Sequence, residues 1–530
     1  MRNKELKRRM KQDYGKIPDP CYFPGDMEYI RAYSDFRRDH HRDAFLLDEI
    51  TWNDLDMDDV FKRINPKLST SGEQYLYYML RSPAIDAAVY EGRKRLIDHM
   101  EAHDDIRLKL QVILARLGCS RRADLCRAFC PSAHGKGKLL VYLFLLLLIP
   151  LSALSSLFVG KSALLLLVLV LLCNSLLHEF VKKRVERDFD TVNYSVSMIF
   201  ALRSIRKLHD AGIDAELKDA YGHLDNLRSV IRTGGISTVS DNGGIGDLIT
   251  TFLLLDLITY EFLKNKLGRS YEDVFAVHEN LGRIDAAIAV ASYRKSIPAF
   301  CEPELCFQPE APVSIYAEQM THPLLEEAVA NDLKTERSVL ITGSNASGKS
   351  TFLKAAALCA VLSQSICTCT AQSYRANAFR IYSSMALSDD LLGGESYYIV
   401  ETKSLKRILD HREEPHPVLC VIDEVLRGTN TVERIAASCE ILKKMGDGGA
   451  LCLAATHDIE LCELLSRQFT LCHFEEFIED EEMVFDYLLR EGPATSRNAI
   501  NLLKLMGFDD SIVEGAHRRA NQYLQEGTWS

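Results

Sequence analysis

The chain has 530 residues, which is enough for about two to four domains. Its composition, 47% hydrophobic and 26% charged, is ordinary for a folded protein. The formal net charge of −11 excludes bulk electrostatic attraction to nucleic acid, so binding of that kind would need a local basic patch.

Fifteen cysteines are present, and none of them forms a CxxC pair. Cys367 and Cys369 alternate along a predicted strand, and Cys301 and Cys306 lie five residues apart. This usage favours buried, reduced thiols in a cytosolic setting over metal ligation. The N-terminus is basic, but no apolar core follows it, so no secretory signal is predicted.

The first part of the chain is predicted to be helical. Residues 1–40 are charged and are expected to form a basic arm or a peripheral helix. Residues 41–135 carry apolar side chains at helical spacing, and Asn65-Pro66 and Ser82-Pro83 are expected to interrupt the helices.

Two apolar runs follow, Leu139–Val159 and Ser162–Leu177, with only Gly160-Lys161 between them. The first is long enough to cross a bilayer as a helix, and the second barely is unless it extends through Phe180. Each leucine favours insertion by roughly 0.5 kcal/mol at the membrane centre. We therefore expect a two-helix transmembrane hairpin over residues 139–178. The alternative is a buried helical pair in a soluble core, for which a polar stripe would be expected.

Basic residues flank both ends of this hairpin: Lys136, Lys138, Lys182, Lys183 and Arg184. The connection between the runs is too short for more than a tight turn, so both outer ends lie on one side. The positive-inside rule then places both termini in the cytoplasm of a multi-pass protein of the cell membrane.

Residues 179–295 are predicted to be mainly helical, with breaks at Gly234-Gly235 and Gly243-Gly244. The long helix after the hairpin carries several cations, namely Arg184, Arg187, Arg203, Arg206 and Lys207. These favour a solvated or juxtamembrane face; contact with lipid headgroups is the second interpretation and contact with nucleic acid the third.

From residue 296 to residue 525, short β runs alternate with helices, which predicts a parallel-sheet α/β domain. Within it, a strand at Ser338–Thr342 and a helix at Phe352–Leu362 enclose a segment that fits G-x-x-x-x-G-K-[ST]. This order favours a phosphate-binding loop over a chance glycine-rich turn. The predicted ATP-binding residues of this loop are Gly343, Ser344, Asn345, Ala346, Ser347, Gly348, Lys349, Ser350 and Thr351.

The chemistry of these residue types is specific. Lys349 would reach the β- and γ-phosphates, and the Ser350 hydroxyl would be a ligand of Mg²⁺. A strand at Val418–Ile422 ends in Asp423-Glu424, where Asp423 could hold Mg²⁺ and Glu424 could polarise the attacking water.

One more strand end carries a candidate catalytic group. Leu451–Ala455 leads to His457, which could donate to a γ-phosphate, although a lone histidine is more often structural. Asn430 and Glu433 resemble a capping box that starts a helix through Met445. A lone Asp-Glu would indicate a surface turn, but its place after a buried strand and a phosphate loop favours a hydrolase site.

Together these motifs resemble the MutS family of mismatch-repair ATPases. The segments that carry the resemblance are Thr321–Leu325, Thr342–Thr351, Asp389–Leu391, Gly394–Ser396, Asp423–Thr431, Ala455–His457 and Gly492–Ser496. Upstream, Leu281–Ser292 and Pro303–Leu305 look like the end of the family's lever domain, and Leu47–Pro83 looks like its start.

The resemblance implies a multidomain chain. A mainly α-helical lever and core region (41–135 and 179–295) would carry the inserted transmembrane hairpin, followed by a C-terminal MutS/ABC-like P-loop ATPase domain. It also implies that Asp423 and Ser350 hold Mg²⁺, that Glu424 activates water and that His457 senses the γ-phosphate. Ser396 would reach across a homodimer to the ATP of the partner.

The sequence also departs from the family. No segment resembles the mismatch-reading N-terminal domain or the extended clamp, and Leu426 replaces a glycine that is common in the D-E-x-G-R-G-T form. Phe300-Cys301-Glu302 has the letters of the reading motif but precedes the ATPase domain, so it is interpreted as a coincidence.

Two hypotheses of function follow. The first is an ATP-driven DNA-binding protein of the repair type that is tethered to the membrane lipid bilayer. The second is an ATP-driven membrane switch or scaffold that acts on a protein partner without DNA. A transporter ATPase is disfavoured, because two membrane helices make no evident substrate path.

Overall fold

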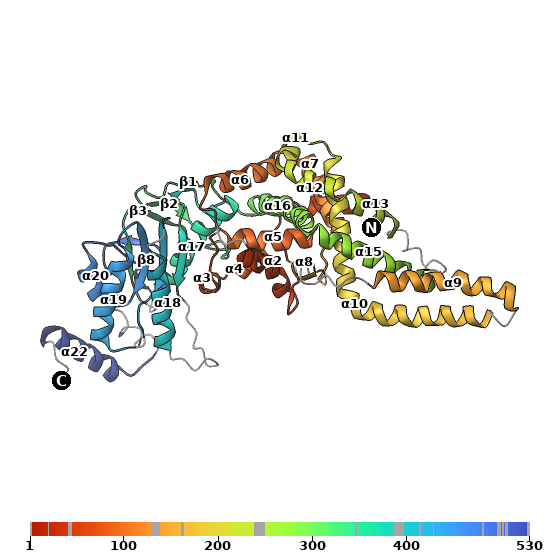
Figure 1. Ribbon diagram of the computed structural model, residues 1–530. Coiled ribbons are helices and arrows are strands. Elements are labelled where there is room, and N and C mark those ends of the chain that lie inside the picture. Colours follow the sequence, from red (N-terminus) through yellow and green to blue (C-terminus); the bar gives the residue numbers. More distant parts are fainter. Residues whose placement is uncertain are drawn as a thin grey trace. The chain divides into compact units, whose positions relative to one another are not determined.

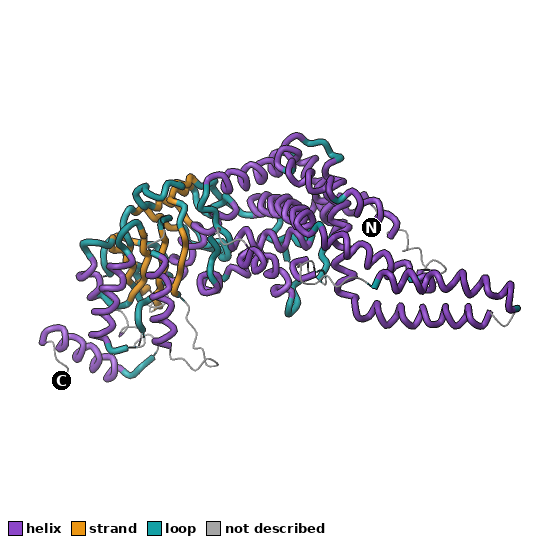
Figure 2. The backbone as a smooth tube through the Cα atoms, viewed as in Figure 1, coloured by secondary structure: helices purple, strands orange, loops and turns teal. Residues whose placement is uncertain are grey.

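The computed structural model describes residues 3–526 except 20, 41–44, 122, 124, 129–137, 161–163, 238–249, 345–346, 386–396, 413–414, 428, 480–481, 495–499, 501–502 and 504–506. The chain divides into two compact units. The first comprises Met1–Arg42, Ile64–Tyr78 and Arg95–Ser296, and the second comprises Asp43–Arg63, Met79–Lys94 and Ile297–Ser530. Helices build the first unit, and the extended strands lie in the second (Figures 1 and 2). The chain is therefore a helix-rich, multidomain protein with a C-terminal α/β region, as the sequence predicts.

The helices that lie wholly within unit one are α1 (Asn3–Asp13), α2 (Asp26–His40), α7 (Asp104–Leu117), α8 (Leu125–Ala128), α9 (Leu139–Val159), α10 (Leu164–Arg206), α11 (Ala211–Glu216), α12 (Lys218–Asn226), α13 (Arg228–Ser237), α15 (Leu255–Arg269) and α16 (Tyr271–Ser296). Helix α5 (Thr70–Arg81) begins in this unit, and helix α6 (Ala87–Ala102) ends in it. The predicted interruptions at the two prolines are confirmed, since α4 (Met57–Ile64) and α5 end just before them.

The predicted break at Gly234-Gly235 is wrong, because α13 continues through both glycines. A glycine inside a helix costs only about 1 kcal/mol. Helix α13 also packs on α15 and buries Val230, and this contact can offset that cost. The other predicted break, Gly243-Gly244, lies outside the described residues.

The core of unit one is built around α16, whose Leu281, Ile284 and Ile288 are fully buried. Helix α5 approaches this helix closely at two glycines. A Cβ atom on Gly72 would lie 2.0 Å from Oδ2 of Asp285, and one on Gly282 would lie 2.5 Å from Cβ of Tyr75. The hydroxyl of Ser69 donates a hydrogen bond to the buried Asp285 carboxyl. Burial raises the pKa of Asp285 to about 7.

The two apolar runs form α9 and α10, which lie side by side along their apolar lengths (Figure 1). Many of their leucines are exposed; Leu140 is 78% exposed and Leu165 is 74% exposed. Within the described part of the chain, α10 is the helix that is long and apolar enough to cross a membrane, and the corresponding apolar stretch of α9, Leu139–Ser155, is shorter. The expectation of two membrane-crossing helices is thus matched by one candidate.

Helix α15 packs against both apolar helices, α9 and α10. Its Leu254 and Leu257 form a buried cluster with Tyr142 of α9. Two polar contacts accompany this cluster. Nδ2 of Asn174 donates to the carbonyl oxygen of Phe252 (3.0 Å), and Nε2 of His178 lies 2.9 Å from Oδ2 of Asp256. The part of α10 around Asn174 and His178 is therefore held to α15 and the residues just before it by both apolar and polar contacts.

The described residues of unit two form three sheets. The largest has the order β12-β9-β4-β8-β7-β6, in which neighbouring strands are parallel except for the antiparallel pair β12 and β9. Its strands are β4 (Val339–Thr342), β6 (Arg380–Ser384), β7 (Val418–Asp423), β8 (Ala450–Thr456), β9 (Thr470–His473) and β12 (Arg490–Glu491). The second sheet, in the order β1-β5-β2-β3, consists of β1 (Glu304–Cys306), β5 (Ser373–Asn377), β2 (Ile315–Met320) and β3 (Asn331–Thr335). The third is the hairpin of β10 (Glu476–Glu479) and β11 (Glu482–Phe485).

The helices of unit two are α3 (Glu49–Asp54), most of α4, α17 (Lys349–Ile366), α18 (Tyr397–His411), α19 (Thr431–Met445), α20 (Glu460–Leu465) and α22 (Asp510–Glu526). The predicted strands before the phosphate loop, before Asp423 and before His457 are confirmed as β4, β7 and β8. Asn430 caps α19, which runs through Met445 as predicted: Oδ1 of Asn430 accepts a hydrogen bond from the Val432 amide (3.0 Å). The return contact of Glu433 in a capping box stays a prediction.

The cysteine prediction needs a correction. Cys367 is the C-cap of α17 with φ 52°, and Cys369 forms only an isolated bridge with Cys301, so these residues do not make a regular strand. The cysteines of the described residues are free thiols. Several are buried in unit two as predicted, but Cys21 and Cys173 are exposed.

Candidate functional site

Three neighbouring parallel strands bring the predicted site residues to one edge of the large sheet. Thr342, the last residue of β4, is paired with Thr456 of β8, and Asp423 of β7 is paired with Ala455 of β8. The carboxyl ends of parallel strands meet at the same edge, where open α/β sheets bind ligands. The phosphate loop, Asp423 and His457 therefore converge, although Gly343 and His457 are 114 positions apart in the sequence.

The phosphate loop turns at two glycines. Gly343 has φ 151° and Gly348 has φ 102°, both outside the range that side chains tolerate well. A Cβ atom on Gly348 would also lie 3.1 Å from Cδ1 of Tyr487, so the backbone passes close to that ring. Asn345 and Ala346 lie outside the described residues.

Lys349 is folded back onto its own loop. Its Nζ donates to the carbonyl oxygens of Gly343 (2.9 Å) and Ser344 (2.7 Å). Burial lowers the pKa of Lys349 to about 8, although the nearby carboxylates of Asp423 and Glu424 act in the opposite direction. Lys349 is thus buried, and its two carbonyl acceptors could be replaced by a phosphate, which is a stronger hydrogen-bond acceptor.

Glu424 lies between two cationic or donor groups. Its Oε1 is 3.0 Å from Nε2 of His457, and its Oε2 is 2.6 Å from Nε of Arg427. Burial raises the pKa of this carboxyl, but the hydrogen bond from His457 and the charges of Arg427 and Lys349 outweigh burial and hold the pKa below its usual value. Glu424 is therefore a carboxylate at neutral pH, and the structure joins it directly to His457.

The turn after β7 is strained, since Glu424 has φ 63° and Leu426 has φ 59°. Glu401 of α18, which is 2% exposed, stabilises this turn. Its Oε1 accepts from the Leu426 amide (2.6 Å), and its Oε2 accepts from the Arg427 amide (3.0 Å). Sequence reasoning missed Glu401, which lies 23 residues before Glu424 and carries no local motif.

The turn that carries His457 has an anchor of its own. Two of the three guanidinium nitrogens of Arg434 donate to the Asp458 carboxylate, Nε at 2.9 Å and Nη2 at 2.5 Å. Since Asp458 follows His457 directly, this bidentate pair fixes the histidine turn to α19. Asp458 was visible beside the predicted histidine, but nothing in the sequence indicated its partner.

A cavity of about 710 Å³ opens over these groups. It is lined by Met320, His322, Leu325, Glu327, Ala328, Val329, Asn331, Ser347, Gly348, Lys349, Ser350, Thr351, Phe352, Ala355, Met385, Asp423, Glu424, Arg427, His457, Phe474 and Tyr487. The lining thus combines apolar side chains with the polar groups of the strand ends. Ligand pockets of about 300–1,000 Å³ are commonly built in this way.

The donor set fits a nucleotide with a hard metal ion. The buried Ser347 hydroxyl has no hydrogen-bond partner within the described part of the chain, so it can serve a phosphate. Ser350 and Asp423 line the same cavity and offer the oxygen ligands that Mg²⁺ prefers. His322 and Tyr487 also line the cavity. Burial lowers the pKa of His322 to about 4, so its ring is neutral and can pack against the base of a nucleotide together with Tyr487.

The segment with the predicted Ser396 lies outside the described residues, as do Asp389-Asp390-Leu391 and the rest of 386–396. The remaining predicted loop residues Ser344 and Thr351 are described. The Ser344 hydroxyl contacts the Glu476 carboxylate (2.5 Å), and Thr351 lines the cavity.

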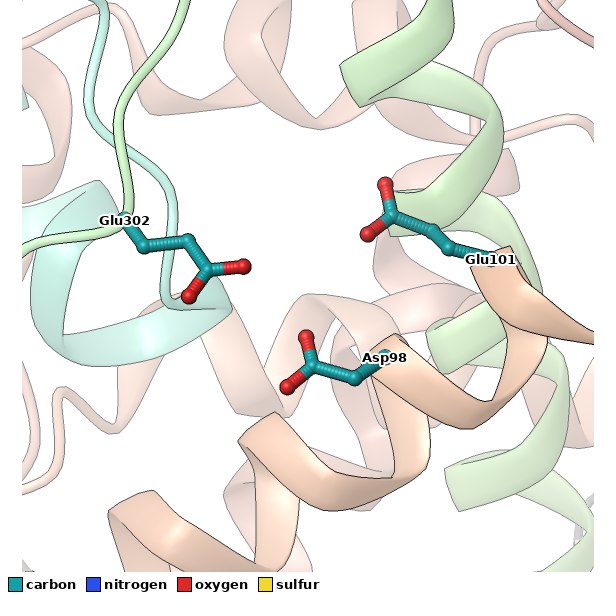
Figure 3. A group of neighbouring side chains, drawn as sticks. All are labelled: Asp98, Glu101 and Glu302. Atoms are coloured by element: carbon teal, nitrogen blue, oxygen red, sulfur yellow. The ribbon is translucent and has the colours of Figure 1, made fainter.

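Three more carboxylates lie outside this cavity. Figure 3 shows Asp98 and Glu101 of α6, and Glu302 of the other unit. Nη1 of the buried Arg294 lies 2.9 Å from Glu101 and 3.4 Å from Asp98, and Nζ of Lys94 lies 2.5 Å from Glu302. Each carboxylate has a cationic partner within its own unit, which accounts for the group without a metal ion. The Phe300-Cys301-Glu302 segment thus places its glutamate in an ion pair.

Comparison with known proteins adds to this geometry. Residues 339–524, which contain the phosphate loop, Glu424 and His457, match the family model of MutS domain V. This part of the chain is thus similar to domain V of the MutS family. The chain is 32% identical over 200 residues to the DNA mismatch repair protein MutS of Thermus thermophilus, an alignment that covers 37% of this chain and 24% of that protein. It is 34% identical over 189 residues to the DNA mismatch repair protein MutS 2 of Haloarcula marismortui, with 35% and 20% covered.

The chain thus spans about a fifth to a quarter of the length of these curated MutS relatives. The shared part is domain V, which in this structure is the large sheet with its cavity. Proteins of the MutS family are ATPases. The five segments expected from the sequence, with their bounds, remain predictions.

Proposed function

We propose that this chain is a Mg²⁺-dependent ATPase that hydrolyses ATP to ADP and phosphate in the cavity of domain V. The observation that supports it best is the contact of Glu424 with His457 at the mouth of a phosphate loop. Bound Mg²⁺ would neutralise phosphate charge. Glu424, a carboxylate by its lowered pKa, would accept the proton of the attacking water.

The other residues have supporting roles in this proposal. Lys349 would leave its two loop carbonyls for the β- and γ-phosphates, and His457 would report the γ-phosphate to Glu424. Arg427 and His457 both contact the Glu424 carboxylate, so they fix its orientation before the substrate arrives.

Replacing Glu424 by glutamine tests this role. Glu424→Gln should lower turnover by about 10²- to 10⁴-fold, the usual contribution of a positioned general base. Binding of Mg·ATP, measured by equilibrium titration, should persist. The exposed Glu440→Gln in α19 is the matched control and should change neither quantity. Undiminished turnover of Glu424→Gln would remove this residue from its role.

We further propose a homodimer in which Ser396 of each chain completes the site of the other, as the family resemblance implies. Mixed dimers distinguish this arrangement. A chain with Lys349→Ala cannot use its own loop, and a chain with Ser396→Ala cannot serve its partner. The dimer of these two chains should therefore keep one working site, because the intact Lys349 and the intact Ser396 meet there. A dimer of one chain with both changes and one unchanged chain should lose both sites. Equal activity of both dimers would contradict the arrangement across subunits.

Membrane anchoring through α9 and α10 is also a proposal, with the two termini and the ATPase domain in the cytoplasm. Its support is the exposure of leucines along both helices and the basic residues that flank them. Protease treatment of sealed vesicles should cleave unit two only when the cytoplasmic face is outside. Release of the chain from membranes by alkaline carbonate would contradict an integral anchor.

For the action of the whole protein, we propose ATP-dependent DNA binding at the membrane, because the matched relatives are named as DNA mismatch repair proteins. The net charge of −11 favours the alternative, a membrane switch or scaffold for a protein partner. A binding assay with the detergent-solubilised protein separates them. Genuine phosphate contacts would weaken steeply with salt, and absence of binding at low salt would eliminate the DNA hypothesis.

A further inference from the structure

Unit one contains an open cavity of about 570 Å³ at the end of α10, distant in sequence from the phosphate loop. Its lining is Arg203, Arg206, Lys207, His209, Leu224, Asp225, Arg228, Ile231 and Arg232. Five arginine or lysine side chains therefore face one carboxylate, in a chain whose net charge is −11. Such a local excess of one sign attracts and concentrates ions of the other sign.

The cations form two rows on two helices in contact. Arg203 and Lys207 are four residues apart at the end of α10, and Arg228 and Arg232 are four residues apart on α13. Helices α10 and α13 pack against each other. Like charges at this spacing repel, so the arrangement is mildly unfavourable unless an anion is bound.

The helix dipole explains only one of the two rows. Cations at the C-terminal end of α10 are favourable, but Arg228 is the first residue of α13, where the dipole favours an anion. No acidic residue lies in the first turn of α13. The positive end of this helix and its arginines thus add to the potential in the cavity.

One acidic side chain organises part of the cluster. Oδ1 of Asp225 lies 2.9 Å from Nη1 of Arg206 and 3.2 Å from Nη2 of Arg228, and Arg206 also stacks over Tyr221. Within the described ranges, no side chain forms an ion pair with the other three cations, Arg203, Lys207 and Arg232. The cavity therefore has two fixed guanidinium groups and three that are free to bind.

The position of the cavity identifies the source of the anion. Helix α10 is continuous from its apolar segment through Lys182 to Arg203. At 1.5 Å per residue, Lys182 and Arg203 lie about 30 Å apart along the helix axis. That distance is too great for the headgroups of a bilayer that holds the apolar segment. A hollow of this volume, with cations on two sides, suits a compact ligand rather than an extended strand.

We propose that this cavity binds a small soluble anion that carries at least two phosphate groups. Arg206 and Arg228 hold one phosphate from fixed positions, and Arg203, Lys207 and Arg232 close on the other. Planar guanidinium groups match phosphate geometry through paired hydrogen bonds.

Equilibrium dialysis of radiolabelled inorganic pyrophosphate against the full chain in detergent tests this. All proteins carry Lys349→Ala, so the phosphate loop does not contribute. The pocket variant adds Arg203→Ala with Arg232→Ala. The matched control adds Arg184→Ala with Arg187→Ala, which removes the same charge from exposed positions on α10. We expect one saturable pyrophosphate site, affinity at least about tenfold weaker in the pocket variant and unchanged affinity in the control.

Equal affinity in the two variants, or no saturable site in the parent, would overturn the proposal. Loss of duplex DNA binding in the pocket variant without any pyrophosphate site would overturn it in favour of a nucleic-acid surface. Displacement of bound pyrophosphate by vesicles that contain phosphatidic acid, but not by uncharged vesicles, would assign the anion to lipid and overturn the proposal of a soluble ligand. Should the double variant fail to fold, the single change Arg232→Gln must still weaken pyrophosphate binding.

Discussion

At the scale of single residues, the turn after β7 combines backbone strain with the buried Glu401, which binds its amides. Glu424 and Leu426 both adopt the left-handed conformation, which costs side-chain-bearing residues about 1–2 kcal/mol each. Glycine is common at the position of Leu426 in related motifs, and the positive φ explains that preference. Here the leucine is buried at 2% exposure, so its apolar contacts offset the strain.

The first prediction concerns Glu401, which binds both amides of this turn. Hydrogen bonds to a charged acceptor contribute about 1.5–3 kcal/mol each, so Glu401→Ala should loosen the turn. We expect kcat to fall about tenfold or more with little change in the Kd for ATP, because the phosphate loop is untouched. Glu401→Gln, which retains one carbonyl acceptor, should recover part of kcat. A rise in Kd without a fall in kcat would contradict this positioning role.

The second prediction is a pH dependence of ATP binding. The pKa of Lys349 is lowered to about 8 in the free protein, and a phosphate partner would raise it. Affinity should therefore be constant below pH 7 and decline above pH 8, with a Kd about tenfold weaker at pH 9 than at pH 7. Isothermal titration across this range measures it. Lys349→Arg should show a flat profile, since guanidinium does not titrate there. The same slope in both proteins would contradict the assignment.

At the scale of elements, local pattern predicts what depends on neighbours in sequence. The strands β4, β7 and β8 are continuous apolar runs, and Asn430 caps α19 through an amide two residues away. These features could be predicted because their causes are local. Glu401 and the pair of Arg434 with Asp458 could not, because each meets its partner only through the fold. Cys367 was mistaken for a strand residue because an alternating pattern does not reveal a helix end.

The third prediction concerns the contact of α5 with α16. Gly72→Ala would place a Cβ atom 2.0 Å from Oδ2 of Asp285, so the helices must separate, and overpacking of this kind costs about 1–3 kcal/mol. Gly222→Ala in α12 meets nothing within 4 Å and should instead stabilise the helix by about 0.5–1 kcal/mol. Chemical denaturation of the two variants measures the difference. Equal stabilities would show that α5 and α16 do not pack as described.

At the scale of the whole molecule, the chain joins an α/β unit with a region similar to MutS domain V to a helical unit with an exposed apolar pair of helices. Asn174 and His178 of α10 contact Phe252 and Asp256, at and just before the start of α15. These contacts tie the apolar pair to the neighbouring helix of unit one. Exposed leucines alone would be a liability in water, and a bilayer would cover them. If the helices instead remained in water, charged residues could replace these exposed leucines at little cost.

The fourth prediction uses this contrast. Leu169 and Leu172 of α10 are 56% and 55% exposed, so two arginines would fit there without steric conflict in water. Near the centre of a bilayer each would cost about 2.5–3.5 kcal/mol. Leu169→Arg with Leu172→Arg should therefore shift the chain out of the membrane fraction. Val432→Arg with Leu464→Arg, at exposed positions of unit two, is the matched control and should leave the distribution unchanged. If both double variants stay in the membrane fraction to the extent of the parent, α10 does not cross the bilayer.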